Sequence, residues 1–259
     1  MKLQLIRNAT MKLNYAGQTL LTDPMLSDPG AFQSFAGIAP NPTIKLPFAI
    51  DTILNGVDLT LISHLHPDHF DAAAAETLPK SMEIFCQPGD ALPLRQKGFT
   101  AVTGVPACQT WRNISITRTD GKHGSGKILE RLGEVSGFVL KASEEPTVYW
   151  IGDSIWCEDV ALAIKTHSPD IIICHSGGAT LPGYAPIIMD GEQTLTTLNF
   201  APQAVVVAVH MEALDHCTVN RRTLRELAEK AGINASRLLI PNDGATLSLS
   251  THIYTSCVR

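Results

Sequence analysis

The 259-residue sequence has no apolar run approaching the roughly 20 residues of a membrane-spanning helix; the longest is Ala204–Val209. It also has no excess of basic residues: 20 Lys and Arg stand against 25 Asp and Glu, giving a net charge of −5. We therefore expect no membrane or nucleic-acid partner, since binding to a phosphate backbone requires a basic face. With 44% hydrophobic and only 17% charged residues, the chain does not have the composition of a disordered protein either.

The sequence also has no pair of cysteines spaced as in a metal or redox site. The six cysteines are scattered without a C-x-x-C pair, and Gln4 and Arg7 interrupt the first apolar stretch where a signal peptide would continue. Cys257 is third from the end, whereas prenylation requires a cysteine in the fourth position. We predict a cytoplasmic protein with reduced thiols.

The chain length fits one large domain, and no linker, repeat or low-complexity tract divides it, so 1–259 is predicted to be a single domain. Apolar runs predict strands at 3–6, 11–15, 19–22, 57–62, 82–86, 99–102, 114–117, 136–140, 147–151, 171–174, 204–209, 238–240 and 245–249. Helices are predicted at 71–77, 90–97, 156–166, 192–200 and 221–230. This pattern predicts an α/β or α+β domain with helices outside and sheet inside.

Two segments rich in proline and glycine interrupt this pattern, Asp23–Ile50 and Ser176–Pro186. The first carries five prolines and three of the eight phenylalanines. Structureless loops of this length are usually functional or disordered. The aromatic content favours a packed flap, and a purely structural loop over the edge of the core is the open alternative.

The histidines are concentrated, because three of the nine lie within six residues of the segment Ser63–Phe70, which reads SHLHPDHF. This segment directly follows the apolar run 57–62, so it lies at the carboxyl end of a predicted strand. His64 and His66 are two residues apart, and in extended backbone such side chains point to the same side. Both imidazoles can therefore reach one metal ion.

The second half of the same segment adds two more potential ligands. Pro67 suits the first turn of a helix, and that helix would turn Asp68 and His69 away from the first pair of histidines. Imidazole and carboxylate are ligands that zinc, iron and manganese accept. Four potential ligands split between two directions predict two metal ions.

The pattern H-x-H-x-D-H after a buried strand resembles the signature of the metallo-β-lactamase superfamily. Asp23 is similar to the early aspartate that ends a strand in that superfamily. His123 resembles the third histidine of the first metal site, Asp153 the carboxylate that bridges both metals, and His210 the last histidine.

The resemblance extends from about Thr10 to Leu249 and implies an α/β fold, a four-layer αββα sandwich. Within the superfamily, the chain looks most like the small bacterial hydrolases that include ascorbate-6-phosphate lactonase. It departs from that branch at Asn8, where a histidine is often found.

The resemblance also implies a ligand set for two divalent ions, Zn or Mn, with Fe as a further option. Metal one would be held by His64, His66 and His123. Metal two would be held by Asp68, His69 and His210, with Asp153 bridging the two ions.

Two of these assignments have structural alternatives. His123 lies in a glycine-flanked polar loop, so the alternative is an ordinary surface histidine. Asp153 precedes a helix-like stretch, so the alternative is a helix N-cap.

The remaining histidines are assigned by their context. His210 is preferred over His216 as a metal ligand because it ends a strand, and His216 is left to contact substrate or support the ligands. His175 also follows a strand, so it either contacts substrate or is structural. His167 and His252 lack such context and are expected at the surface.

The function predicted on this basis is that of a binuclear metallohydrolase. A hydroxide bridging the two metals would attack a small-molecule ester, lactone or phosphodiester, and Asp68 would orient it. The ions would also suit an anionic substrate despite the negative net charge. The alternatives are an iron-dependent oxidoreductase similar to sulfur dioxygenases and a binding protein without catalysis. Apart from its substrate, we predict only self-association as a homo-oligomer.

Overall fold

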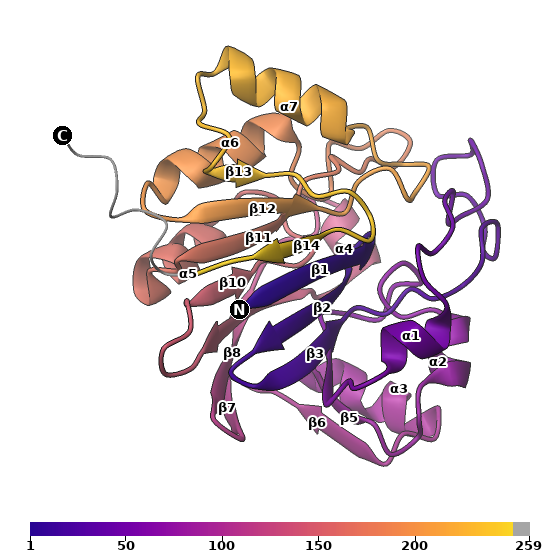
Figure 1. Cartoon of the computed structure of the whole chain (residues 1–259). Coiled ribbons are helices and arrows are strands. Elements are labelled where there is room, and N and C mark those ends of the chain that lie inside the picture. Colours follow the sequence, from indigo (N-terminus) through magenta and orange to yellow (C-terminus); the bar gives the residue numbers. More distant parts are fainter. Residues whose placement is uncertain (251–259) are drawn as a thin grey trace.

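The computed structural model describes residues 1–250, whose strands form two mixed sheets of seven strands each (Figure 1). The first sheet has the order β14-β1-β2-β3-β4-β5-β6. Its strands are β1 (Lys2–Arg7), β2 (Thr10–Tyr15), β3 (Gln18–Thr22), β4 (Leu59–Ile62), β5 (Glu83–Cys86), β6 (Ala101–Gly104) and β14 (Thr246–Ser248).

The second sheet has the order β13-β12-β11-β10-β9-β8-β7. Its strands are β7 (Cys108–Trp111), β8 (Ile114–Asp120), β9 (Ser136–Lys141), β10 (Val148–Trp150), β11 (Ile171–His175), β12 (Val205–Val209) and β13 (Leu238–Leu239). Each sheet is thus built from one continuous half of the chain, except that β14 returns to the first sheet.

The helices other than α4 pack on the outer faces of the two sheets (Figure 1). On the first sheet lie α1 (Ile50–Leu54), α2 (Ala72–Thr77) and α3 (Ala91–Gln96), which follows the 3₁₀ turn η1 (Pro88–Asp90). On the second sheet lie α5 (Glu158–His167), α6 (Gly191–Phe200) and α7 (Arg221–Lys230), and the short α4 (Ile128–Leu132) packs on the loop after β11. None of the helices within 1–250 is long and apolar enough to cross a membrane.

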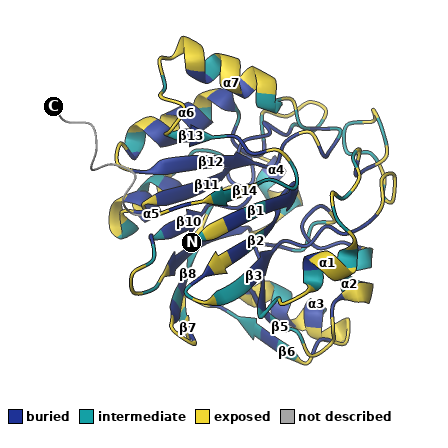
Figure 2. Ribbon diagram, in the orientation of Figure 1, coloured by how far each residue is buried: buried dark blue, intermediate teal, exposed yellow. Residues whose placement is uncertain are grey.

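Alternation along the strands divides the core into three apolar layers. In β4, Leu59 and Leu61 face the other sheet, whereas Ile62 packs against the helices outside. In β11, Ile173 faces inward and Ile172 faces outward. Strands that bury both faces, such as β11 and β12, are mostly apolar, and Figure 2 shows them dark blue beneath helices with exposed outer faces. The predicted four-layer αββα sandwich is confirmed.

Strand direction brings several strand ends to one edge. In the first sheet β1, β3 and β4 run the same way, because β2 is antiparallel to both β1 and β3 and β4 is parallel to β3. In the second sheet β8, β10, β11 and β12 likewise share one direction. Ligands of open α/β sheets bind beyond the carboxyl ends of the strands. The loops after these strands carry the predicted metal ligands.

Several short elements differ from the sequence expectation. The sequence pattern does not predict α1, β7 and α4, which are four or five residues long, too short for periodicity to show. The strand expected at 99–102 lies at Ala101–Gly104, because Phe99 belongs to the turn after α3 and packs into the helix-side core.

The helix expected to begin at Pro67 begins instead at Ala72. Asp71 is its N-cap, and the Asp71 carboxylate accepts a hydrogen bond from the Ala74 amide at 2.8 Å. Residues 67–69 form a turn in which the amides of His69 and Phe70 both donate to the His66 carbonyl at 2.9 Å. A helix start at Pro67 was therefore wrong, whereas the helix predicted at 71–77 is confirmed to within one residue. The turn directs His69 Nε2 towards Asp68 and Asp153, although the His69 ring centre lies 4.1 Å from that of His64.

Candidate metal centre

The first ligand group consists of three imidazoles contributed by both sheets. His64 and His66 follow β4, and His123 follows β8. The His64 Nε2 and His66 Nδ1 atoms are 2.9 Å apart, and the His123 ring centre lies 5.2 Å from that of His66. His123 Nδ1 donates to the Ile187 carbonyl at 2.9 Å, which leaves Nε2 with a lone pair for a metal.

The second ligand group contains two carboxylates and two imidazoles. His69 Nε2 lies 3.1 Å from Asp153 Oδ2 and 3.4 Å from Asp68 Oδ2. His210, at the end of β12, places Nε2 3.4 Å from Asp68 Oδ2 and 3.3 Å from His69 Nε2. Asp153 Oδ2 is also 3.5 Å from His123 Nε2, so this carboxylate joins the two groups.

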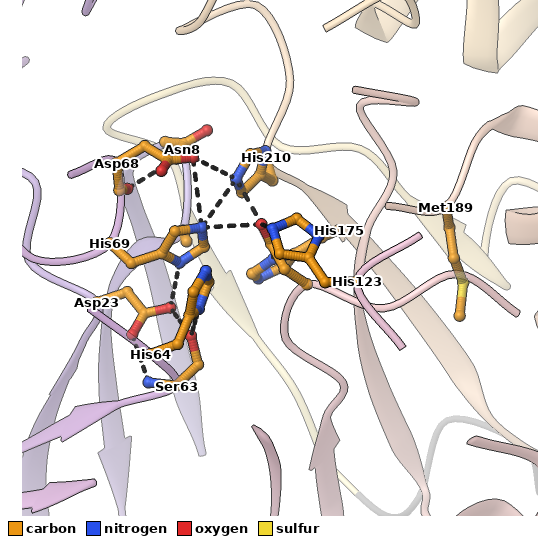
Figure 3. A network of polar contacts seen from close by, with 12 residues as sticks. Asn8, Asp23, Ser63, His64, Asp68, His69, His123, His175, Met189 and His210 are labelled. Carbon is orange, nitrogen blue, oxygen red and sulfur yellow. Dashed lines mark hydrogen bonds and ion pairs between the residues drawn. The ribbon is translucent and has the colours of Figure 1, made fainter. Parts of the chain in front are cut away.

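Asp23 supports the ligands from beneath (Figure 3). Its Oδ2 accepts from His69 Nδ1 and from the Ser63 hydroxyl, both at 2.6 Å, and its Oδ1 accepts the Ser63 amide at 2.7 Å. The Ser63 hydroxyl in turn lies 2.9 Å from His64 Nδ1. One buried carboxylate therefore orients a histidine of each ligand group, which is the usual role of an outer partner at a metal site.

A second support runs through the core to Asp153. The Trp150 indole donates from Nε1 to His175 Nε2 at 2.9 Å, which places the imidazole proton on Nδ1. That proton is donated to Asp153 Oδ1 at 2.5 Å. Both nitrogens of His175 are thus engaged, and the structure favours the structural alternative for this residue.

Asn8 ties the first strand to the same centre. It adopts a left-handed conformation (φ 59°), which asparagine tolerates better than most residues. Its side-chain nitrogen donates to the Asp68 carbonyl at 3.1 Å, and its own carbonyl accepts the His210 amide at 3.1 Å. Asn8 therefore fixes the backbone of one ligand from each sheet.

Burial and charge act in opposite directions on the histidines. Burial and the neighbouring His69 lower the pKa of His64 well below its usual range, and burial lowers the pKa of His123 to about 4. Burial also acts to lower the pKa of His210, but the Asp153 and Asp68 carboxylates outweigh it and raise that pKa to about 10. Burial likewise opposes a charged His69, but Asp153 and Asp68 raise the pKa of His69 well above its usual range.

These residues fit the two metal ions that the sequence predicts. The ligand atoms of His64, His66 and His123 lie within 4.8 Å of one another, and so do those of Asp68, His69, Asp153 and His210. The His69 and His210 nitrogens face each other at 3.3 Å, where at most one proton fits between them. A dense cluster of buried imidazoles and carboxylates matches the ligand preferences of zinc, manganese and iron.

A cavity of about 260 Å³ opens above the ligands. The ligand residues on its wall are His66, Asp68, His123 and Asp153, and the other lining residues are Ser34, Phe35, Pro67, Arg131, Leu132, Leu181, Ile187 and His216. His216 is only 6% exposed, its Nδ1 has no hydrogen-bond partner within residues 1–250, and its ring packs edge-on against Phe35 at 4.8 Å.

Residues 24–49, which we term the covering loop, form one side of this cavity. Apart from an isolated bridge between Phe32 and Asn41, the loop has no strand or helix, as its composition predicts. Arg7 is fully buried and donates to the carbonyls of Met25, Ser27 and Ile44, each at 2.8 Å. The loop is therefore packed, although its backbone is irregular.

Asp215 holds the tip of the covering loop. Its carboxylate accepts the amides of Phe35 at 3.0 Å, of Ala36 and Ile38 at 3.2 Å and of Ala39 at 3.3 Å. It also accepts the Ser34 hydroxyl and, at 2.9 Å, the side-chain amide of Asn41. These bonds hold the pKa of Asp215 well below its usual range, despite the opposing effect of burial.

The structure brings the seven predicted ligands together in the two predicted groups. His123 is buried, not on the surface, and Asp153 is not an N-cap, because α5 begins at Glu158 after Cys157. His216 lines the cavity, whereas His175 does not.

His167 is half-buried at the end of α5. His252 and Cys257 lie outside the described residues.

Sequence reasoning missed three residues that shape the site: Trp150, Asp215 and Arg131. Trp150 has no pattern beyond that of a core residue, and Asp215 bonds mainly to backbone amides, which any sequence supplies. The only available signal for Asp215 was its position next to His216.

The family described as "Beta-lactamase superfamily domain" matches residues 18–211 of this chain. The "UPF0173 protein YddR" of Bacillus subtilis is 36% identical over 250 residues, which are 94% of this chain and 98% of that protein. Two solved structures are also similar. An isothiocyanate hydrolase from Delia radicum gut bacteria is 37% identical, with a TM-score of 0.91 and coverage of 97% of this chain and 100% of that one. A possible metal-dependent hydrolase from Veillonella parvula is 31% identical, with a TM-score of 0.93 and coverage of 96% and 99%.

Proposed function

This chain belongs to the β-lactamase superfamily domain family and, within it, to the UPF0173 metal-dependent hydrolases; from this premise we propose a binuclear hydrolase of small molecules. The observation that carries the proposal is the position of Asp153. One oxygen lies near His69 and His123, and the other near His210 and His175. A carboxylate between two separate ligand groups is what two adjacent ions require.

We assign the two ions as the sequence predicts, and the two ligand groups support this assignment. His64, His66 and His123 would hold one ion, Asp68, His69 and His210 the other, and Asp153 both. When bound, two divalent cations such as Zn or Mn supply hydroxide at neutral pH and polarise the oxygen of a carbonyl or phosphoryl group.

Other side chains of the cavity would orient the reacting groups and contact the substrate. Asp68 lines the cavity and belongs to the second ligand group, so we assign it to orient the hydroxide that the two ions would supply. His216 presents an imidazole to the cavity and is the residue we assign to the developing charge or to the leaving group. Phe35, Leu181 and Ile187 supply apolar contact for the substrate.

The bond cleaved is that of an ester, a lactone or a phosphodiester, because each offers a polarised oxygen to the two ions. A second candidate is the hydrolysis of an isothiocyanate. The similar isothiocyanate hydrolase supports it, since its identity of 37% extends over nearly the whole chain. The apolar side of the cavity also suits the organic part of such a compound. The narrower resemblance to the ascorbate-6-phosphate lactonase branch stays a prediction.

Metal analysis and a substrate screen test this proposal together. Protein purified without added metal is expected to carry two ions per chain and, loaded with Zn or Mn, to hydrolyse at least one of the four compound classes. Less than one metal per chain, together with no hydrolysis in Zn, Mn or Fe, would overturn it. An iron-loaded protein that consumes oxygen would instead support the oxidoreductase alternative. The Asp68→Ala variant must lose activity, and full metal content with full activity would contradict its assigned role.

A further inference from the structure

Arg131 lies on the cavity wall and follows the candidate metal ligand His123 closely in sequence. It belongs to α4, which begins five residues after His123. Ile128 anchors the helix by packing with Ile187 in a small apolar cluster. Because the Ile187 carbonyl also accepts the hydrogen bond from His123, the same loop positions both the ligand and the helix. Arg131 is thus placed relative to the metal centre by buried contacts.

The guanidinium of Arg131 has no acidic partner among the described residues 1–250. It is exposed, and within residues 1–250 it makes no ion pair or hydrogen bond. Other arginines of the chain differ: Arg7 binds three carbonyls, and Arg221 pairs with Glu212 and Asp243. A cation without a partner on the wall of a cavity is available to a ligand.

The other charged groups of the wall cannot neutralise it. Asp68 and Asp153 are the carboxylates on the cavity surface, and both lie within 3.6 Å of histidine nitrogens in the second ligand group. With two divalent ions bound, these two carboxylates would leave the floor with a net positive charge. The interior of the cavity therefore attracts anions, although the whole chain carries a charge of −5.

Apolar side chains make up the rest of the wall around this cation. Phe35 comes from the covering loop, Leu132 from α4, and Leu181 and Ile187 from the loop after β11. The volume of about 260 Å³ lies below the roughly 300–1,000 Å³ typical of sites for drug-sized ligands. The cavity therefore fits a short organic body with a polar group at more than one end.

We propose that Arg131 binds an anionic group, specifically a carboxylate, on a small substrate whose apolar body lies against Phe35 and Leu181 and whose scissile bond lies at the metal ligands. The planar guanidinium matches the two oxygens of a carboxylate, so the contact gives direction as well as charge. This inference rests on the proposed hydrolase function and restricts its substrates to acids with a hydrolysable group.

A binding experiment tests Arg131 without requiring turnover. Metal-loaded wild-type protein, Arg131→Gln and Arg131→Lys are titrated with 3-phenylpropanoate and with the neutral 3-phenylpropanamide. The control variant is Arg222→Gln, since the Arg222 side chain is 80% exposed on α7. We expect Arg131→Gln to bind the carboxylate at least about tenfold more weakly and the amide unchanged, with Arg131→Lys between. Equal binding of the carboxylate by wild type and Arg131→Gln would overturn the inference.

A turnover experiment then separates this inference from the hydrolase function. The substrates are phenyl butanoate and monophenyl succinate, which differ by a terminal carboxylate. The wild-type kcat/KM is expected to favour the succinate by about tenfold or more, and Arg131→Gln to reduce this preference to about one. If Arg131→Gln keeps the preference for the succinate, the inference about Arg131 is overturned, whereas the proposed hydrolase function is not. Failure to hydrolyse either ester counts against esters as substrates, and the binding experiment still decides the role of Arg131.

Discussion

The metal ligands and the covering loop border the same cavity but are held in different ways. The seven candidate ligands follow strands whose backbones are fixed in the two sheets. They contact one another, and His69 also bonds to Asp23. The covering loop has no such ladder, and its ends and tip are fixed mainly by two charged side chains, Arg7 and Asp215. The ligands are fixed by strand pairing and by one another, whereas the loop is fixed by side-chain hydrogen bonds and by apolar packing without strand pairing.

This difference suggests that the ligand groups determine the reaction and that the covering loop determines which substrate binds. A ligand group fixed by two sheets tolerates little change, because each histidine and carboxylate orients the next. A loop fixed by a few hydrogen bonds can change its length or its side chains without disturbing the sheets. Loss of a ligand should therefore affect kcat and metal content, and loss of a loop contact should affect KM.

The largest effect is expected from Asp153→Asn, which removes the carboxylate shared by both ligand groups. Metal content should fall to one ion or fewer per chain, and kcat should fall more than about 100-fold, since even outer partners of metal ligands are worth roughly 10–100-fold. Metal analysis and initial rates measure both. The control is Asp120→Asn, whose side chain is 70% exposed. Two ions retained with unchanged kcat would show that Asp153 is not a ligand.

The pH dependence of metal binding tests the electrostatics of the ligands. The neighbouring carboxylates raise the pKa of His210 to about 10 and raise that of His69 well above its usual range, so at pH 7 without metal the two facing nitrogens hold the one proton that fits between them. That proton must leave on binding, so the apparent affinity should rise by up to about tenfold per pH unit between roughly pH 7 and 9. The lowered pKa of His123, about 4, contributes nothing in this range. Calorimetry with Mn²⁺ in buffers of different ionisation enthalpy counts the protons, and a count of zero would contradict the prediction.

A smaller effect on the ligands is expected from Trp150→Phe, which keeps an aromatic ring in the core but removes the donor to His175. His175 would lose the bond that fixes its tautomer, and Asp153 would be held less firmly. We expect about tenfold weaker binding of the second metal, at the lower end of the effect of outer partners. Trp111→Phe is the matched control, because Trp111 lies in the same core cluster and its indole makes no hydrogen bond within 1–250. Equal affinities of the two variants would exclude the role of the indole.

The smallest effect is expected at the loop, from Asp215→Ala. The amides of residues 35–39 would lose their acceptor, and Phe35 would no longer be held against His216. We expect KM to rise about fivefold, equivalent to ~1 kcal/mol, with kcat and metal content unchanged. Asp215→Asn, which keeps an acceptor oxygen, should lie between. A fall in kcat or in metal content of Asp215→Ala would show that the loop, like the ligands, affects the metal centre.

The same distinction explains what the sequence predicts. The ligand residues carry chemistry in their side chains and follow apolar runs, so the spacing of His64, His66 and His69 indicates a metal site. Resemblance to a family adds His123, Asp153 and His210, which lie far away in sequence.

The contacts of the loop leave no such pattern. Asp215 mostly accepts from backbone amides, and 174 residues separate it from Asn41. The helix start at Pro67 was wrong for a related reason, because a single cap at Asp71 outweighs the preference of proline for a first turn. Local preferences are weak where one tertiary or capping hydrogen bond decides the backbone.

The division of each ligand group between the two sheets has a consequence for biosynthesis. A ribosome delivers His64 and His66 first, but the imidazole of His123 is oriented only when Ile187 has been added, and the second group is complete only at His210. The first sheet itself is closed last, when β14 pairs with β1. The proposed first ion would therefore have its full set of ligands only after Ile187, and the proposed second ion only after His210. Metal loading would then be a late event, because it would require both sheets to have formed.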